Sequence, residues 1–259
     1  MSFKKISDLL ESLNERAPFW MAEAWDNVGL LVGNAESPVS RVLLSDDLTP
    51  SAVQHAREVG AELILNHHPC IFKGLKSVTT GELPGLERSI YECVRDGIAV
   101  LALHTNFDRA DTQVGTRVAK GLGLQPEGVF DERDGTGYGV WGVLEKEQSS
   151  DEFFDQIKKT FDVEHFWAAF PFSKRVKRVG FTPGKGASFV QEALTRQLDV
   201  FITGEVGYHE MLRARNAGLC VVELGHRESE RFFPEVVGEW LRGLGVTVEL
   251  DWVPTQTIF

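Results

Sequence analysis

Apolar strand-like runs alternate with helix-like segments along nearly the whole chain. In the first half we predict strands near 41–45, 62–66 and 98–103, and helices near 3–16, 50–59, 84–95 and 111–121. In the second half we predict strands near 138–145, 163–169, 176–181, 200–203, 219–224 and 246–251, with helices near 151–160, 187–196, 207–216 and 228–242. Such alternation predicts an α/β protein whose sheets are flanked by helices.

A glycine-rich, acidic stretch over 122–137 is the best candidate for a domain boundary. The 259 residues suffice for one large α/β domain or two smaller ones. We predict an N-terminal domain over 1–126 and a C-terminal domain over 127–259, and leave open that the final elements pack back on the first. Matches at an offset of 137, such as Arg41-Val42 with Arg178-Val179, are consistent with an internal duplication, although shared patterning would produce some of them.

Histidines and carboxylates cluster directly after four of the apolar runs. In chain order the clusters are His67-His68, His104 with Asp108, Glu205 with His209, and His226 with Glu230. Ligands of open α/β sheets bind beyond the carboxyl ends of the strands, and imidazole is the commonest metal-binding side chain. Four such clusters at equivalent places therefore predict a metal site.

Each cluster also has an ordinary structural interpretation. His67-His68 could form a polar turn, and His104 with Asp108 a hydrogen-bonded loop. His226 and Glu230 could be a solvent-facing helical pair, and Glu205 the cap of the following helix. The Trp25-Asp26-Asn27 loop could be a packed aromatic residue followed by an Asx turn. The recurrence of clusters after four runs favours the metal site over these separate explanations.

Composition narrows the class of protein. The net charge of −11 argues against nucleic-acid binding over a broad surface, because phosphate contacts need a basic face. It does not argue against a nucleotide in a pocket where metal ions supply positive charge. No apolar run approaches the roughly 20 residues that span a bilayer, and the first residues have no secretory apolar core. Three scattered cysteines do not form a disulfide framework, so we expect a cytoplasmic protein.

Five motifs follow one another in a specific order. They are Trp25-Asp26-Asn27-Val28-Gly29-Leu30, Leu65-Asn66-His67-His68-Pro69, His104-Thr105-Asn106-Phe107-Asp108, Thr203-Gly204-Glu205 with His209, and Gly225-His226-Arg227-Glu228-Ser229-Glu230. In this order they resemble the Nif-three-like family, whose bacterial members are known as GTP cyclohydrolase one type two homologues. Asp47 is similar to the family's acidic residue after an early strand. Arg227 and the loop 182–186 depart from the family pattern, which bears on substrate recognition.

The resemblance implies two linked α/β domains with a dinuclear metal centre in the cleft between them. Carried over by motif, the metal ligands are His67, His68, Asp108, His226 and Glu230. Three imidazoles and two carboxylates suit two divalent ions such as Zn, Fe, Mn, Co or Ni better than Ca or Mg. The resemblance also implies a toroidal homohexamer, built as a trimer of dimers.

The ligand set favours a hydrolase that directs metal-bound hydroxide at a nucleotide or related small anionic substrate. GTP specificity follows from the family name alone, since the chain has no P-loop spacing. Glu205, His209 and His104 are the candidates for proton transfer or for orienting the ligands. Two other functions stay open: a non-catalytic metal-binding or regulatory protein, and a phosphodiesterase-like or peptidase-like metallohydrolase with a substrate other than GTP.

Overall fold

The sheets of the protein belong to two structural units, seen in a computed structural model that describes residues 4–78, 85–169 and 175–251. The first unit comprises Met1–Ala110 and Phe233–Phe259, and the second comprises Asp111–Phe232. The boundary therefore lies before the predicted 126/127 position. The C-terminal segment returns to the first unit because its strand β13 (Thr247–Leu250) pairs in parallel with β4 (Arg41–Ser45).

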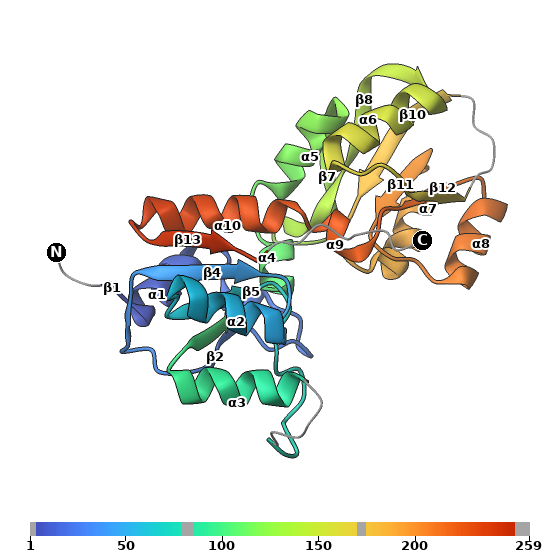
Figure 1. The fold of residues 1–259 in the computed structure, drawn as a ribbon. Helices are drawn as coiled ribbons and strands as arrows, with labels where there is room; N and C mark the ends of the chain where they lie inside the picture. Colours follow the sequence, from blue (N-terminus) through green and yellow to red (C-terminus); the bar gives the residue numbers. More distant parts are fainter. Residues whose placement is uncertain (1–3, 79–84, 170–174, 252–259) are drawn as a thin grey trace. The chain divides into compact units, whose positions relative to one another are not determined.

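The first unit is a five-stranded sheet covered by helices. Its strand order is β13-β4-β5-β6-β2, with β5 at Leu63–Asn66, β6 at Ala99–Ala102 and β2 at Gly29–Val32. Helices α2 (Pro50–Val59) and α3 (Leu86–Asp96) bury their apolar sides against one face, where Leu43, Ile64 and Val100 lie. The remaining helices are α1 (Ile6–Arg16), α4 (Thr105–Arg109) and α10 (Phe232–Gly243), with the short η1 (Phe19–Met21) and the strand pair β1 (Lys4–Lys5) and β3 (Pro38–Val39) (Figure 1).

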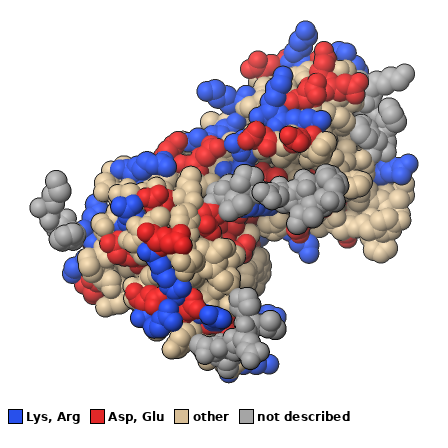
Figure 2. All heavy atoms as spheres, in the orientation of Figure 1, with Lys and Arg blue, Asp and Glu red and all other residues tan. Residues whose placement is uncertain are grey.

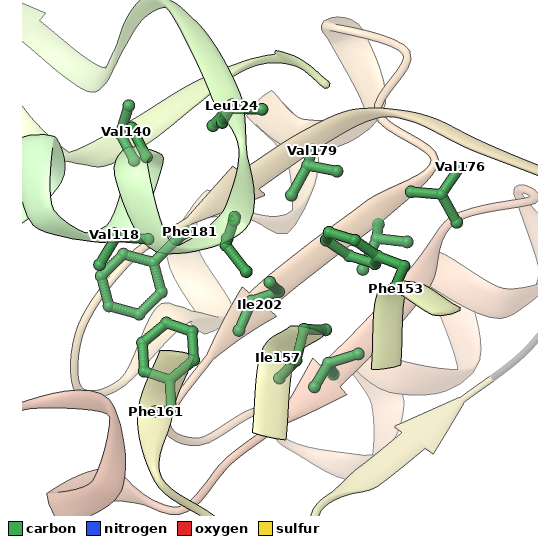
Figure 3. Close-up of a cluster of buried hydrophobic side chains, with 14 of the residues drawn as sticks. Val118, Leu124, Val140, Phe153, Ile157, Phe161, Val176, Val179, Phe181 and Ile202 are labelled. Carbon is green, nitrogen blue, oxygen red and sulfur yellow. The ribbon is translucent and has the colours of Figure 1, made fainter. Parts of the chain in front are cut away.

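The second unit is a six-stranded sheet between two pairs of helices. Its strand order is β7-β8-β10-β11-β12-β9. The strands are β7 (Leu124–Arg133), β8 (Thr136–Ser149), β9 (Trp167–Ala169), β10 (Arg175–Phe181), β11 (Val200–Thr203) and β12 (Cys220–Glu223). The helices are α5 (Val114–Leu122), α6 (Ser150–Phe161), η2 (Gly186–Phe189), α7 (Val190–Thr195), α8 (Tyr208–Asn216) and α9 (His226–Ser229). Figure 3 shows the core between α6 and the sheet, where Phe153, Ile157 and Phe161 meet Val179 and Ile202.

The stretch predicted as a domain boundary is mostly a β-hairpin. Strands β7 and β8 pair antiparallel, with Arg133 opposite Thr136 at the turn. The two turn residues, Asp134 and Gly135, both have positive φ, 53° and 80°. This is the backbone of a type I′ turn, and Asp-Gly is one of its preferred sequences. The glycines and acidic residues therefore mark a tight turn inside the second unit.

Both sheets contain three successive parallel strands with the same neighbours. In the first unit β4, β5 and β6 pair in parallel, and β2 follows as an antiparallel edge strand. In the second unit β10, β11 and β12 pair in parallel, and β9 follows as an antiparallel edge strand. The four polar clusters come after β5, β6, β11 and β12. Within each unit, two clusters therefore lie at the carboxyl edge of adjacent strands.

Among the residues described, no helix has the length and apolarity needed to cross a membrane. Figure 2 shows Asp and Glu side chains interspersed with Lys and Arg on the face in view.

Cys70, Cys93 and Cys220 are free and buried. Burial raises the pKa of the Cys70 thiol to about 11 and those of Cys93 and Cys220 to about 12, so none is an activated nucleophile.

Candidate metal centre

His67 lies directly after β5, with its side chain fully buried. Its Nδ1 lies 2.8 Å from the backbone oxygen of Leu103. Because a carbonyl oxygen only accepts, Nδ1 carries the proton and donates it there. The lone pair of the neutral ring is therefore on Nε2, which lies 3.7 Å from Oδ1 of Asp108. This nitrogen and this carboxylate offer ligand atoms to one cation.

His68 is oriented in a similar way by an acidic residue. Its Nδ1 lies 3.1 Å from Oδ1 of Asp47, which follows β4. The rings of His67 and His68 are 5.2 Å apart between centroids. Asp108 is in α4, directly after β6. The first unit thus brings two imidazoles and two carboxylates together at the carboxyl edge of three adjacent strands.

His104, a candidate for proton transfer, is held by a buried carboxylate. Its Nδ1 lies 2.9 Å from Oδ1 of Asp26, whose side chain is fully buried. Asp26 also accepts hydrogen bonds from the backbone N–H of Thr105, at 3.1 Å, and from the Thr105 hydroxyl. Burial alone would raise the pKa of Asp26, but the hydrogen bonds from His104 and Thr105 outweigh it and lower that pKa. Asp26 is therefore an anion that holds His104 in place.

The sequence motif Trp25-Asp26-Asn27 was recognised, but no role for Asp26 in the site was predicted from it. Trp25 is 61% exposed, so the loop is not the packed aromatic residue of the ordinary interpretation. The carboxylate of Asp26 reaches from the loop before β2 to the N-terminus of α4. An Asp within a Trp-Asp-Asn loop is a weak sequence signal, because only the fold reveals its partner 78 positions further along the chain.

In the second unit, His226 lies between two carboxylates. Its Nδ1 is 3.3 Å from Oε1 of Glu205, and its Nε2 is 3.2 Å from Oε1 of Glu230. The Glu230 side chain is only 3% exposed, so the pair is not the solvent-facing helical pair of the ordinary interpretation. A neutral imidazole has a single N–H, which suits Glu205, while Nε2 and Glu230 together suit a bound cation.

The loop 182–186 closes against this pair. Gly184 has φ +60°, and a Cβ at this position would lie 2.7 Å from Oε1 of Glu230 and 3.5 Å from Nε2 of His226. Its backbone N–H donates to the hydroxyl of Ser229, at 2.9 Å, and that hydroxyl donates to the His226 carbonyl. Glycine is therefore required for both backbone conformation and space. The loop that departs from the family pattern is thus part of this site.

Glu205 and His209 are not related by a helical turn, although they lie four positions apart in the sequence. Helix α8 begins at Tyr208 and its N-cap is Gly207, so Glu205 precedes the helix and does not cap it. Glu205 is instead in an extended segment bridged to Lys185. The His209 side chain is exposed and its ring contacts that of Tyr208. Of the two residues, only Glu205 has a contact with His226 among the interactions described.

The donors present fit divalent metal ions. In each of the three histidines His67, His68 and His226, the Nδ1 atom faces an oxygen. These oxygens are the backbone carbonyl of Leu103 for His67, Oδ1 of Asp47 for His68 and Oε1 of Glu205 for His226. Metal-ligating histidines typically use such an outer partner to orient the ring and select its tautomer. Each unit therefore has a set of His and carboxylate side chains in the arrangement of metal ligands.

Fold and site together define an α/β protein with two units and clusters of histidine and carboxylate side chains that could hold a metal ion. The chain matches the family model Duf34/NIF3 (NGG1p interacting factor 3) over residues 4–257. The chain belongs to this family. The resemblance predicted from its motifs is thereby confirmed.

Individual relatives agree with this family. A Helicobacter pylori protein named GTP cyclohydrolase 1 type 2 is 32% identical over 258 residues, covering 98% of this chain and 99% of the relative. A Clostridium perfringens protein named GTP cyclohydrolase 1 type 2 homolog is 31% identical, with 87% of each chain covered.

Solved structures share the fold over the full length. A Staphylococcus aureus hypothetical protein has a TM-score of 0.88 at 24% identity, covering 100% of this chain and 99% of that one. A Bacillus cereus protein related to NIF3 has a TM-score of 0.84 at 20% identity, with 100% of both chains covered. The predicted α/β fold class is therefore confirmed.

Proposed function

We propose that the protein is a divalent-metal-dependent hydrolase whose metal ions are held by histidine and carboxylate side chains. The ligands would be His67, His68, Asp108, His226 and Glu230. The observation that carries this proposal is the shared orientation of the three imidazoles, each with Nδ1 facing an oxygen. His67 and His68 are also members of a group of candidate metal ligands. Three imidazoles and two carboxylates favour Zn, Fe, Mn, Co or Ni.

Divalent ions bound by these residues would supply Lewis acidity and lower the pKa of water. The chain's own side chains would contribute orientation and proton transfer. Asp26 holds the Nδ1 side of the His104 ring, which leaves Nε2 to take or give a proton. Glu205 fixes the orientation of His226. His209 stays a proposed proton carrier on the exposed start of α8.

The proposed substrate is a small anion, with a nucleotide as the first class to test. The support for GTP is the printed name of the relatives, GTP cyclohydrolase 1 type 2. We further propose that the protein is a cytoplasmic homohexamer, a trimer of dimers. Size-exclusion chromatography with light scattering tests the assembly, since a hexamer has six times the 28.9 kDa mass of the chain.

Metal content and turnover together test the function. The full-length protein is purified without chelators, its metals are quantified, and products are identified after incubation with a panel of nucleotides that includes GTP. We expect bound divalent metal, and turnover that chelation abolishes and Mn or Zn restores. A protein that retains metal without turning over any substrate would instead support the binding or regulatory function. A protein that binds no divalent metal would contradict both.

Glu205 and His209 can be separated by matched variants. We expect Glu205→Gln to lower metal affinity about 10- to 100-fold, because outer partners of ligating histidines typically have this effect. His209→Asn should leave metal affinity at the parent value, because the side chain is exposed and contacts Tyr208. Titration of each variant with Zn measures its metal affinity. Equal affinities in the parent and Glu205→Gln would show that Glu205 does not orient a ligand.

A further inference from the structure

Two large aromatic side chains stack on each other at the surface of the first unit. The rings of Trp25 and Phe72 have centroids 6.0 Å apart and planes inclined by only 13°. They are 61% and 46% exposed, among the more exposed large apolar side chains of the described residues. Exposed aromatic rings are common individually, but a stacked pair presents a flat apolar surface.

Polar contacts hold this pair in place. Asn27, two positions after Trp25, donates from Nδ2 to the backbone oxygen of Ile71 at 2.6 Å, and Ile71 precedes Phe72. The carboxylate of Asp26 is bound at the same time by His104 and Thr105. The Trp-Asp-Asn motif thus links the loop before β2 to the segment after β5 and to the N-terminus of α4. Both aromatic residues are neighbours of these anchored positions.

The aromatic pair adjoins the candidate ligands of the first unit. The His104 ring lies 6.0 Å from that of Trp25 and 5.6 Å from that of Phe72, edge-on to both. The His104 ring also contacts the rings of His67 and His68, with centroid distances of 5.5 Å and 5.6 Å. One imidazole therefore separates the exposed aromatic surface from the two histidines proposed to bind metal.

We propose that Trp25 and Phe72 form a stacking platform for the planar heteroaromatic ring of the substrate. This inference rests on the proposed function, in which His67 and His68 hold the metal ions beside the reacting group. Aromatic side chains bind nucleobases through their ring faces, with little dependence on the base, and a flat pair next to a cationic centre suits a ring that bears an anionic group. The platform would select ring-bearing substrates and orient them toward His104.

Neutral nucleosides separate ring stacking from binding of charge to the metal. The probes are guanosine and adenosine, with inorganic triphosphate as an anion that has no ring, and binding is measured by calorimetry on the metal-loaded full chain. Stacking on an aromatic side chain contributes about 1–3 kcal/mol per base. We expect Trp25→Ala and Phe72→Ala to weaken nucleoside binding about tenfold or more and to leave triphosphate binding unchanged. Trp25→Phe should restore most of the nucleoside affinity.

Trp167→Ala is the matched control, because Trp167 is 78% exposed and belongs to the second unit. Parent-like nucleoside affinity in both platform variants would overturn the proposal. So would a parent protein that binds metal and triphosphate but no nucleoside, an outcome that leaves the proposed function intact. A change of assembly size in Trp25→Ala would show that the rings are an interface between copies. If the protein binds no divalent metal but binds nucleosides in a way that depends on Trp25, the proposed hydrolase function is contradicted and the stacking platform is supported.

Discussion

Asp108→Ala and His226→Ala should each lose bound metal while keeping the native fold. Each variant removes one proposed ligand, and loss of a ligand should lower affinity by at least the roughly 10- to 100-fold known for outer partners. Neither side chain fills a core: Asp108 is 13% exposed and His226 is 33% exposed. Metal per chain is measured by plasma emission spectrometry after dialysis, and the fold by circular dichroism. Turnover should fall with metal content.

Two exposed residues of the same types supply the controls. Asp111→Ala removes a carboxylate three positions after Asp108, and His165→Ala removes an exposed histidine of the second unit. Both controls should bind metal like the parent. If His226→Ala and Asp108→Ala also kept the parent's metal content, these residues would not be ligands. Loss of metal in only one of them would mean that the other is not a ligand.

Most elements could be predicted from local patterns, because each buried strand or amphipathic helix has its own apolar periodicity. The strand at 41–45 and the helix at 50–59 were predicted with the bounds that β4 and α2 have. Strand β7 was missed because its residues 125–127 are exposed and the glycines within and beside it, Gly123, Gly128 and Gly135, resemble a linker. The Asp134-Gly135 turn signal was present and would have indicated the hairpin.

The domain assignment depended on pairing that no local pattern contains. Strand β13 joins β4 across about 200 residues of sequence, with Thr247 opposite Arg41. Its pattern predicted a strand, and left open whether the final elements pack back on the first domain. The parallel pairing places the C-terminal segment in the first unit, so the chain does not divide into two consecutive domains.

Site residues were easier to predict where the chemistry was concentrated in sequence. His67-His68 and the pair of His226 and Glu230 were proposed as ligands from residue types and spacing, and this assignment stays a prediction. Asp26 was not assigned a role, because its partner His104 comes from another loop. The four-residue spacing of Glu205 and His209 does not place them on one helical face, since the helix starts only at Tyr208. Spacing predicts a shared face only when both residues are in the helix.

Asp26→Ala should destabilise the first unit and impair turnover together. The fully buried carboxylate accepts hydrogen bonds from His104 and from two groups of Thr105, and bonds to charged groups contribute about 1.5–3 kcal/mol each. We expect a loss of about 3 kcal/mol in the free energy of unfolding at pH 7, measured by urea denaturation. If His104 transfers a proton, turnover should also fall by about 10²–10⁴-fold.

The pH dependence of the same variant identifies the physical cause. The pKa of Asp26 is lowered in the folded protein by the hydrogen bonds that outweigh its burial, so its ionised form is favoured by folding. The stabilisation is therefore fully present above the ordinary Asp pKa of about 3.9 and is lost as pH falls through the lower folded value. The difference in unfolding free energy between the parent and Asp26→Ala should therefore shrink as the pH is lowered from about 5 to about 3. A difference that stays constant over this range would mean that Asp26 stabilises the fold by packing, and that His104 is not held by an anion.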